Sequence, residues 1–188
     1  MGLIEIILIA VGLAMDAFAV SIAAGTSGKL GGKRGIFRLS FHFGLFQALM
    51  PVVGWYAGVH IAALISAIDH WVAFALLLFV GIRMIKGSFD TQTDSFKEDP
   101  SRGASLVILS IATSIDALAV GLSLAMLEVN IWYPCVIIGV ITAGLSVIGI
   151  QTGKFFGRKL GSRMELVGGA ILILIGCRIL ISHLIQEL

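Results

Sequence analysis

The chain has 188 residues, of which 58% are hydrophobic and 13% are charged, with a formal net charge of +2. A typical soluble domain has about 25% charged residues, so this composition argues against a soluble protein and against one that binds nucleic acid. The two cysteines, Cys135 and Cys177, form neither a disulfide framework nor a paired metal-binding motif.

Six long apolar runs follow one another along the chain. Each is close to the ~20 residues that a helix needs to cross the bilayer core, and none shows the alternation of a transmembrane strand. We therefore predict an all-α integral membrane protein with a single membrane domain over residues 1–188. The six predicted transmembrane helices span residues 3–24, 39–59, 71–89, 104–126, 132–153 and 165–185.

Basic residues alternate between the connections that join these runs. The first, third and fifth connections carry Lys and Arg, whereas the second and fourth carry none. The positive-inside rule places the odd connections in the cytoplasm, so we expect both the N- and the C-terminus outside. The basic residues of the odd connections are Lys29, Lys33, Arg34, Arg38, Lys86, Lys97, Arg102, Lys154, Arg158, Lys159 and Arg163.

An internal repeat links the two halves of the chain. "DAFAV" at 16–20 returns as "DALAV" at 116–120, and "VGIRMI" at 80–85 returns as "IGCRIL" at 175–180. The second match has an offset of 95 residues, which several glycines share. Matches among Leu, Ile and Val arise easily by chance in so apolar a chain, but matches of Asp, Gly and Arg do not. The glycine pairs are Gly44 with Gly139, Gly54 with Gly149, and Gly58 with Gly153.

The repeat divides the chain into two units of three helices, residues 1–98 and 99–188. Because three is odd, the second unit must enter the membrane in the opposite orientation. Two inverted-topology repeats of this kind are a plan of secondary transporters, which bind their substrate near the middle of the membrane. A channel or a non-transporting scaffold with internal symmetry is the alternative.

Asp16 and Asp116 are the most informative polar residues. Each lies about 18–20 Å along its predicted helix, at 1.5 Å per residue, and is therefore deep in the bilayer core. Acids at this depth usually face the interior of a bundle and mark the path of an ion or a proton. Their charges require compensation, by a shared proton, by the arginine pair Arg83 and Arg178, or by a divalent cation.

Neutral oxygen atoms accompany the two acids. An oxygen-rich site with two carboxylates suits Mg²⁺, Ca²⁺ or Mn²⁺ better than a softer metal. Pro51 adds an alternative, because a proline within a helix frees the carbonyl four residues earlier, but it could equally serve only to shape packing. The residues alone thus predict a transporter of a hard divalent cation or a proton-coupled transporter. The predicted additional ion-site or pathway residues are Gln47, Thr113, Ser114, Thr142 and Ser146.

Four motifs together resemble the bacterial manganese efflux pump family, within the lysine-exporter-type superfamily. They are "MDAFAVS" at 15–21, "PVVGW" at 51–55, "GIRMI" at 81–85 and "TSIDALAVG" at 113–121. The resemblance covers essentially the whole chain. It implies export of Mn²⁺ across the inner membrane and metal binding by the two motif acids, Asp16 and Asp116.

The resulting expectation is an exporter of Mn²⁺ that works by alternating access, with the metal between the first and fourth helices. Manganese is then the transported substrate and no cofactor is expected; the lipid bilayer is the only other expected partner. Coupling to inward proton movement is a hypothesis. The alternatives are export of another small cation or of an amino acid, with Arg83 or Arg178 binding its carboxylate, and a non-transporting scaffold. An enzyme is not expected, because no HExxH or GxSxG motif is present.

Overall fold

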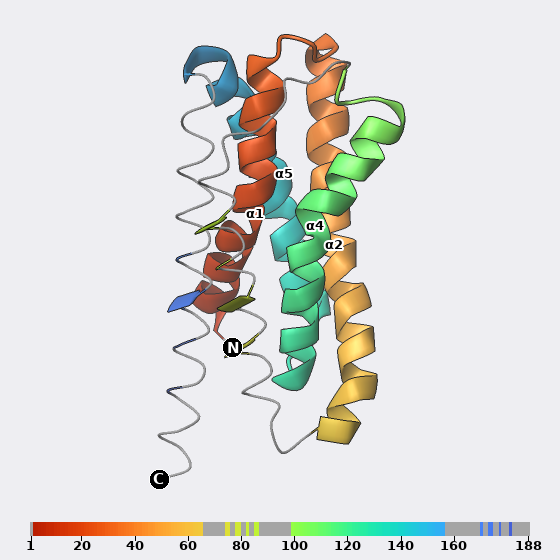
Figure 1. Ribbon diagram of the computed structural model, residues 1–188, viewed down its shortest axis with the longest axis vertical. Coiled ribbons are helices and arrows are strands. Elements are labelled where there is room, and N and C mark those ends of the chain that lie inside the picture. The colour runs from red at the N-terminus through yellow and green to blue at the C-terminus, as the bar shows by residue number, and fades with distance from the viewer. Residues whose placement is uncertain are drawn as a thin grey trace.

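In the part of the chain that it describes, the computed structural model is helical and has four long helices that are apolar enough to cross a membrane (Figure 1). In chain order they are α1 (Leu3–Thr26), α2 (Gly32–Ile65), α4 (Gly103–Met126) and α5 (Trp132–Phe156). The fold is therefore that of a multi-pass membrane protein. The structure describes residues 2–65, 74–75, 78–79, 82, 85–86, 99–156, 170, 173–174, 177 and 181, without the side chains of 61–65.

The observed helices follow the predicted ones closely, with one extension. The helix predicted over 39–59 is α2, which begins at Gly32 and continues to Ile65. The sequence-based boundary came from the basic residues around Lys33 and Arg38, but such residues can occupy the end of a helix where it leaves the apolar layer. The helices predicted over 71–89 and 165–185 lie mostly outside the described residues; the positions described within them, such as Phe74, are helical.

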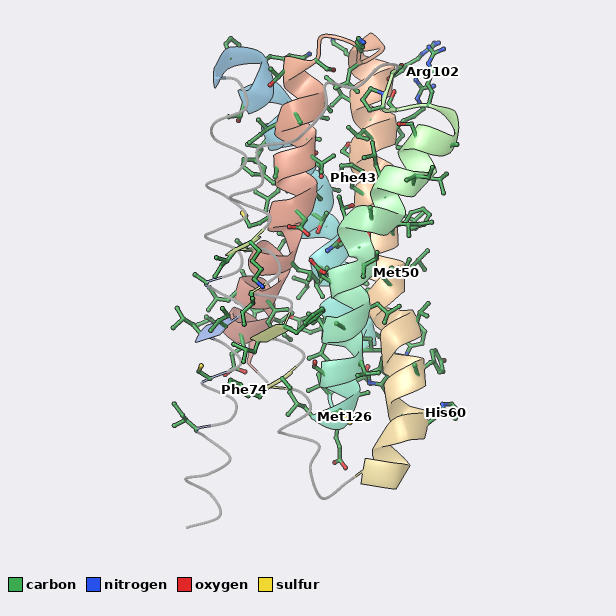
Figure 2. All side chains as sticks on the ribbon, viewed as in Figure 1. Phe43, Met50, His60, Phe74, Arg102 and Met126 are labelled. Atoms are coloured by element: carbon green, nitrogen blue, oxygen red, sulfur yellow. The ribbon has the colours of Figure 1, made fainter. Side chains whose placement is uncertain are left out.

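The four helices run in two directions. In Figure 1, α1 and α5 run upward, whereas α2 and α4 run downward. The α1–α2 connection and the start of α4 therefore lie at one end, which we call the basic end because it carries Lys29 and Arg102. Figure 2 shows Arg102 there and shows His60 and Met126 at the opposite end. The basic residues of the first connection and those before α4 thus lie at the same end, as the alternation of the connections predicts.

The helices pack crosswise rather than in chain order. α1 packs mainly against α5, α2 packs mainly against α4, and α2 also crosses α5, whereas α1 meets α2 and α4 much less. The first helix of each predicted repeat thus pairs with the second helix of the other. This arrangement interlocks the two halves of the chain.

Glycines bring the backbones of α1 and α5 together. A side chain at Gly149 or Gly153 would run into the backbone of Phe18 or Ile22 on α1. Without a Cβ, the two helices can approach closely along this stripe, as they often do in membranes. The hydroxyl of Thr26 adds a cross-link, because it lies 3.1 Å from the carbonyl oxygen of Gly153.

The interface between α2 and α4 repeats this arrangement. A side chain at Gly54 would run into the backbone of Leu118, and one at Gly58 would meet Leu122. Gly54 and Gly58 are the glycines that the 95-residue offset pairs with those of α5, and Leu118 and Leu122 follow Phe18 and Ile22 by 100 residues. The two offsets found in the sequence therefore describe equivalent contacts in space. The α2·α5 crossing is reciprocal too, because Gly44 and Gly139 face each other there.

The apolar core lies where α1, α4 and α5 meet, and it positions the candidate site. Its members are buried side chains from these three helices and from Ile131, just before α5, so burying them holds the middle of α1 and α4 in place. They are Ile9, Ala10, Leu13, Met15, Phe18, Ile22, Ala117, Val120, Leu124, Ile131 and Ile138.

Candidate ion-binding site

The two acids occupy equivalent places in two antiparallel helices. Asp16 lies in the 24-residue α1 and Asp116 in the 24-residue α4, each thirteen residues after the first residue of its helix. At ~1.5 Å per residue, each carboxylate is about 20 Å along its helix. Asp116 is 3% exposed, and Asp16 is partly buried. Both acids are thus held near the middle of helices long enough to cross a membrane.

Each acid points away from the helix on which its own helix mainly packs. On α4, Ser114 and Leu118 contact α2, and Asp116 lies two residues from each. At ~100° per residue, two residues correspond to a turn of about 200° around the helix axis. Asp16 has the same relation to Phe18, which contacts α5. The carboxylates therefore do not lie within the two glycine-lined interfaces.

Gln47 links three helices at the depth of the acids. Its fully buried amide group donates a hydrogen bond from Nε2 to the carbonyl oxygen of Leu13 on α1, over 3.1 Å. Its Oε1 lies 3.1 Å from the Ser114 hydroxyl on α4, and that hydroxyl also lies 2.6 Å from the Ser110 carbonyl. Leu13 precedes Asp16 by three residues. Both acids therefore lie within about one helical turn of this amide along the membrane normal.

The other predicted ion-site residues all carry hydroxyls, and they divide into two groups by whether the hydroxyl has a hydrogen-bond partner. Thr113 is buried, but its hydroxyl donates back to its own helix, 3.0 Å from the Leu109 carbonyl. Thr142 and Ser146 on α5 are fully buried, and within the described part of the chain their hydroxyls have no hydrogen-bond partner. A buried hydroxyl without a partner costs free energy, so these two are the more informative.

Ser21 on α1, which was not among the predicted site residues, belongs to the same group as Thr142 and Ser146. It is fully buried, and its hydroxyl finds no partner among the residues that the structure describes. Its Cβ lies 2.9 Å from where a Cβ on Gly149 would be, so it belongs to the α1·α5 interface. No signal in the sequence singled it out. The equivalent position 100 residues later is Gly121, where a side chain would run into Pro51.

The predicted charge partners are not among the described residues. Arg83 and Arg178 both lie outside them, so their pairing with the acids stays a prediction. Within the described ranges, no three His, Cys, Asp or Glu side chains gather into a metal-binding group.

A separate polar cluster closes the basic end between α2 and the start of α4. Asp99 lies 3.1 Å from Arg102 and 4.0 Å from Arg38, and it accepts a hydrogen bond of 2.7 Å from the Ser101 hydroxyl. Burial acts to raise the pKa of Asp99, but the Ser101 hydrogen bonds and the two arginines outweigh it and hold this pKa below the ordinary 3.8. Ser101 is thus fully buried and Asp99 is partly buried at this end of α4.

Antiparallel membrane-spanning helices with an acid buried at matched positions define a multi-pass membrane protein with a polar centre. The comparisons with known proteins identify its family. The family described as "Putative manganese efflux pump" matches residues 32–180. The chain belongs to this family.

Curated relatives cover nearly the whole chain and carry the name "Putative manganese efflux pump MntP". The protein of Desulfosudis oleivorans is 53% identical over 188 residues, with 97% of this chain and 98% of the relative covered. The proteins of Syntrophotalea carbinolica and of Geobacter sp. (strain M21) are each 50% identical, over 185 and 183 residues, with the same shares covered. No solved structure matches this chain.

Proposed function

We propose that this chain exports Mn²⁺ from the cytoplasm across the bacterial inner membrane by alternating access. The observation that carries the proposal is the pair of carboxylates, Asp16 and Asp116, at matched positions in antiparallel helices of an apolar bundle. The family and the names of the relatives agree with manganese as the substrate and with export as the direction. A transporter, rather than an enzyme, is the class that this site supports.

The full architecture that we propose is two inverted repeats of three helices, residues 1–98 and 99–188. The equivalent glycine contacts of α1·α5 and α2·α4 support it, as do the opposite directions of α1 and α4. The basic end faces the cytoplasm in this proposal, with both termini outside, because basic connections are retained on that side.

The two carboxylates are the proposed metal ligands. Two negative charges at low dielectric repel each other, and a divalent cation bound between them removes that cost. Carboxylate oxygens also match the preference of Mn²⁺ for hard ligands. Protons can compete with the metal for the same oxygens, so inward proton flow could drive export. Arg83 and Arg178 are the proposed charge partners of the acids when no metal is bound.

Neutralising either acid tests this site. Asp16→Asn and Asp116→Asn keep the size of each side chain but remove its charge, so each should abolish Mn²⁺ accumulation by inverted membrane vesicles, whose cytoplasmic face is outward. Glu128→Gln is the matched control, because Glu128 is exposed in the α4–α5 connection and should transport normally.

The amount of each variant in the membrane must be measured alongside transport. Both Asn variants at normal abundance with normal accumulation would refute the site. Vesicles of the unaltered chain that move an amino acid and no Mn²⁺ would refute the substrate.

A further inference from the structure

The α1·α5 interface holds a polar group that the acids do not explain. Ser21, Thr142 and Ser146 are each 0% exposed, and none of their hydroxyls has a hydrogen-bond partner within the described residues. The other buried hydroxyls of the described helices behave differently. Those of Ser40 and Ser110, for instance, donate to carbonyl oxygens one turn earlier in their own helices.

The three hydroxyls share one interface. Thr142 and Ser146 are four residues apart, and they continue the α5 stripe of Gly149 and Gly153 that contacts α1. Ser21 meets that stripe from the α1 side, at Gly149. Thr142, Ser146 and the position of Ser21 thus follow one another from the middle of α5 toward the basic end, over about 10 Å at 1.5 Å per residue.

This group is distinct from the proposed carboxylate site. Asp16 lies about 200° around α1 from Phe18, the residue that meets Gly149, so it faces away from the hydroxyls. The contacts of Gly149 with Phe18 and of Gly153 with Ile22 place Ser146 opposite Met15, which is next to Asp16 in depth. The hydroxyls therefore lead from the basic end to the depth of Asp16, on the other side of α1.

Three neutral hydroxyls match a particular form of the cation. Stripping water from a divalent cation is costly, and hydroxyls without a negative charge do not compensate that cost. They can, however, accept hydrogen bonds from the waters that such an ion retains. The chemistry therefore favours a hydrated divalent cation that is held through its water shell.

We propose that Ser21, Thr142 and Ser146 form a hydroxyl station in the α1·α5 interface, which binds the hydrated divalent cation on its way from the basic end to the carboxylates. The proposal rests on the proposed export function and adds a second binding place to it. Because Gly149 and Gly153 pack tightly against α1, α1 and α5 must separate for the ion to reach the station. Because Asp16 lies on the other side of α1, the ion must then pass around this helix to reach the carboxylates. The station acts on ion entry, whereas the carboxylates bind the ion at the centre.

The test compares two triple variants of the full-length chain in inverted membrane vesicles, with Mn²⁺ as the probe. The first combines Ser21→Ala, Thr142→Val and Ser146→Ala. Each lost hydrogen bond to the water shell weakens binding a few-fold, so the KM for Mn²⁺ should rise about tenfold or more. The maximal rate should stay within about twofold, because the carboxylates are intact.

The control triple combines Ser40→Ala, Ser110→Ala and Thr152→Val. These hydroxyls donate to their own helices, at distances of 2.8 Å to Ile36, Leu106 and Ile148. The control should keep the KM of the unaltered chain. A KM that is unchanged in the first triple, or raised equally in both, would overturn the station.

A stability measurement separates an ion station from internal hydrogen bonding. Without Mn²⁺, the purified first triple should unfold at the same temperature as the unaltered chain or a higher one, because buried hydroxyls without partners are replaced by apolar groups of similar shape. A lower unfolding temperature with an unchanged KM would assign the hydroxyls to packing and refute the proposal. If the triple does not fold, Thr142→Val alone must raise the KM.

The same vesicles distinguish this proposal from the export function. An unaltered chain that does not accumulate Mn²⁺ would refute both. An unaltered chain that accumulates Mn²⁺, together with a first triple of normal KM, would refute the station alone and leave export in place.

Discussion

The α1·α5 and α2·α4 interfaces have the same backbone plan and bury different polar groups. Both use two glycines, at equivalent positions, to bring helices into contact. At the position where α2 carries Gln47, however, α5 carries Thr142, because the two are 95 residues apart. The Gln47 amide is hydrogen-bonded to α1 and lies within reach of the Ser114 hydroxyl on α4, whereas the Thr142 hydroxyl has no partner among the described residues.

This difference teaches that the matched positions of the two interfaces share their contact surfaces and not their polar groups. Pro51 on α2 likewise corresponds to Ser146 on α5, and Gly121 on α4 corresponds to Ser21 on α1. The α2·α4 interface is thus tied by a buried amide, and the α1·α5 interface holds hydroxyls that have no hydrogen-bond partner among the described residues. We interpret the first interface as fixed and the second as the one whose helices separate when the ion enters the proposed station.

Adding a methyl group to a glycine contact should have the largest effect. Gly54→Ala would place its Cβ against the Leu118 carbonyl, closer than Gly149→Ala would approach Phe18 at 2.8 Å. Each should destabilise the protein by roughly 1–3 kcal/mol, with Gly54→Ala the worse. Thermal unfolding in detergent measures this. Gly144→Ala is the control, because its Cβ would meet nothing within 4 Å; equal losses at all three positions would contradict close packing as the cause.

The next largest effect on stability should come from replacing Gln47 and Thr142, which occupy equivalent positions, and it should distinguish the two interfaces. Gln47→Leu removes a buried amide that bonds α1, so it should lower stability by about 1–3 kcal/mol. Thr142→Val removes a hydroxyl that has no hydrogen-bond partner among the described residues. It should therefore leave the free energy of unfolding unchanged or slightly higher. Unfolding temperatures of the two variants, measured side by side without Mn²⁺, give the comparison. A greater loss of stability for Thr142→Val than for Gln47→Leu would reverse our interpretation of the two interfaces.

Replacing Asp99 should have the smallest effect on stability, and this effect should be confined to one end of the α2·α4 interface. Since folding lowers the pKa of Asp99, its contribution to stability is present above the unfolded value of 3.8 and disappears as pH falls through the lower folded value. Asp99→Asn should therefore be less stable than the unaltered chain at pH 7, by less than about 1 kcal/mol, since the pair is near the surface.

Unfolding midpoints at pH 7 and below pH 3.8 check the sign of this effect, since the gap between the two proteins should close in acid. A gap that is independent of pH would mean that the Asn side chain disturbs packing and that the carboxylate charge contributes nothing.

Much of the fold was predictable because membrane helices are specified locally. Apolar length predicted α1, α4 and α5 to within three residues at every end. The start of α2 was missed by seven residues, Gly32 against 39, because charged residues can belong to a helix that projects beyond the apolar layer. The acids were found for an equally local reason: a carboxylate within an apolar run is costly wherever the helix packs.

The polar neighbours of the acids were less predictable, since their roles depend on which face each helix presents to which neighbour. Thr113 and Thr142 are both threonines within apolar helices, so the sequence does not distinguish them. The Thr113 hydroxyl donates to its own helix, whereas the Thr142 hydroxyl has no hydrogen-bond partner among the described residues. Ser21 was overlooked because only the contact with Gly149 reveals that it belongs to the same interface as Ser146.

The sequence by itself predicted that the chain crosses the membrane in helices, that its halves are related, and that Asp16 and Asp116 lie deep within those helices. These properties follow from apolar length, from the matching offsets and from the cost of a buried charge. Only the tertiary structure decided that α1 pairs with α5 and α2 with α4. It also placed the Gln47 amide between Leu13 of α1 and Ser114 of α4, and it left the Thr142 hydroxyl without a partner among the described residues. The physical reason is that close packing between helices is a property of two surfaces, and a single helix sequence contains only one of them.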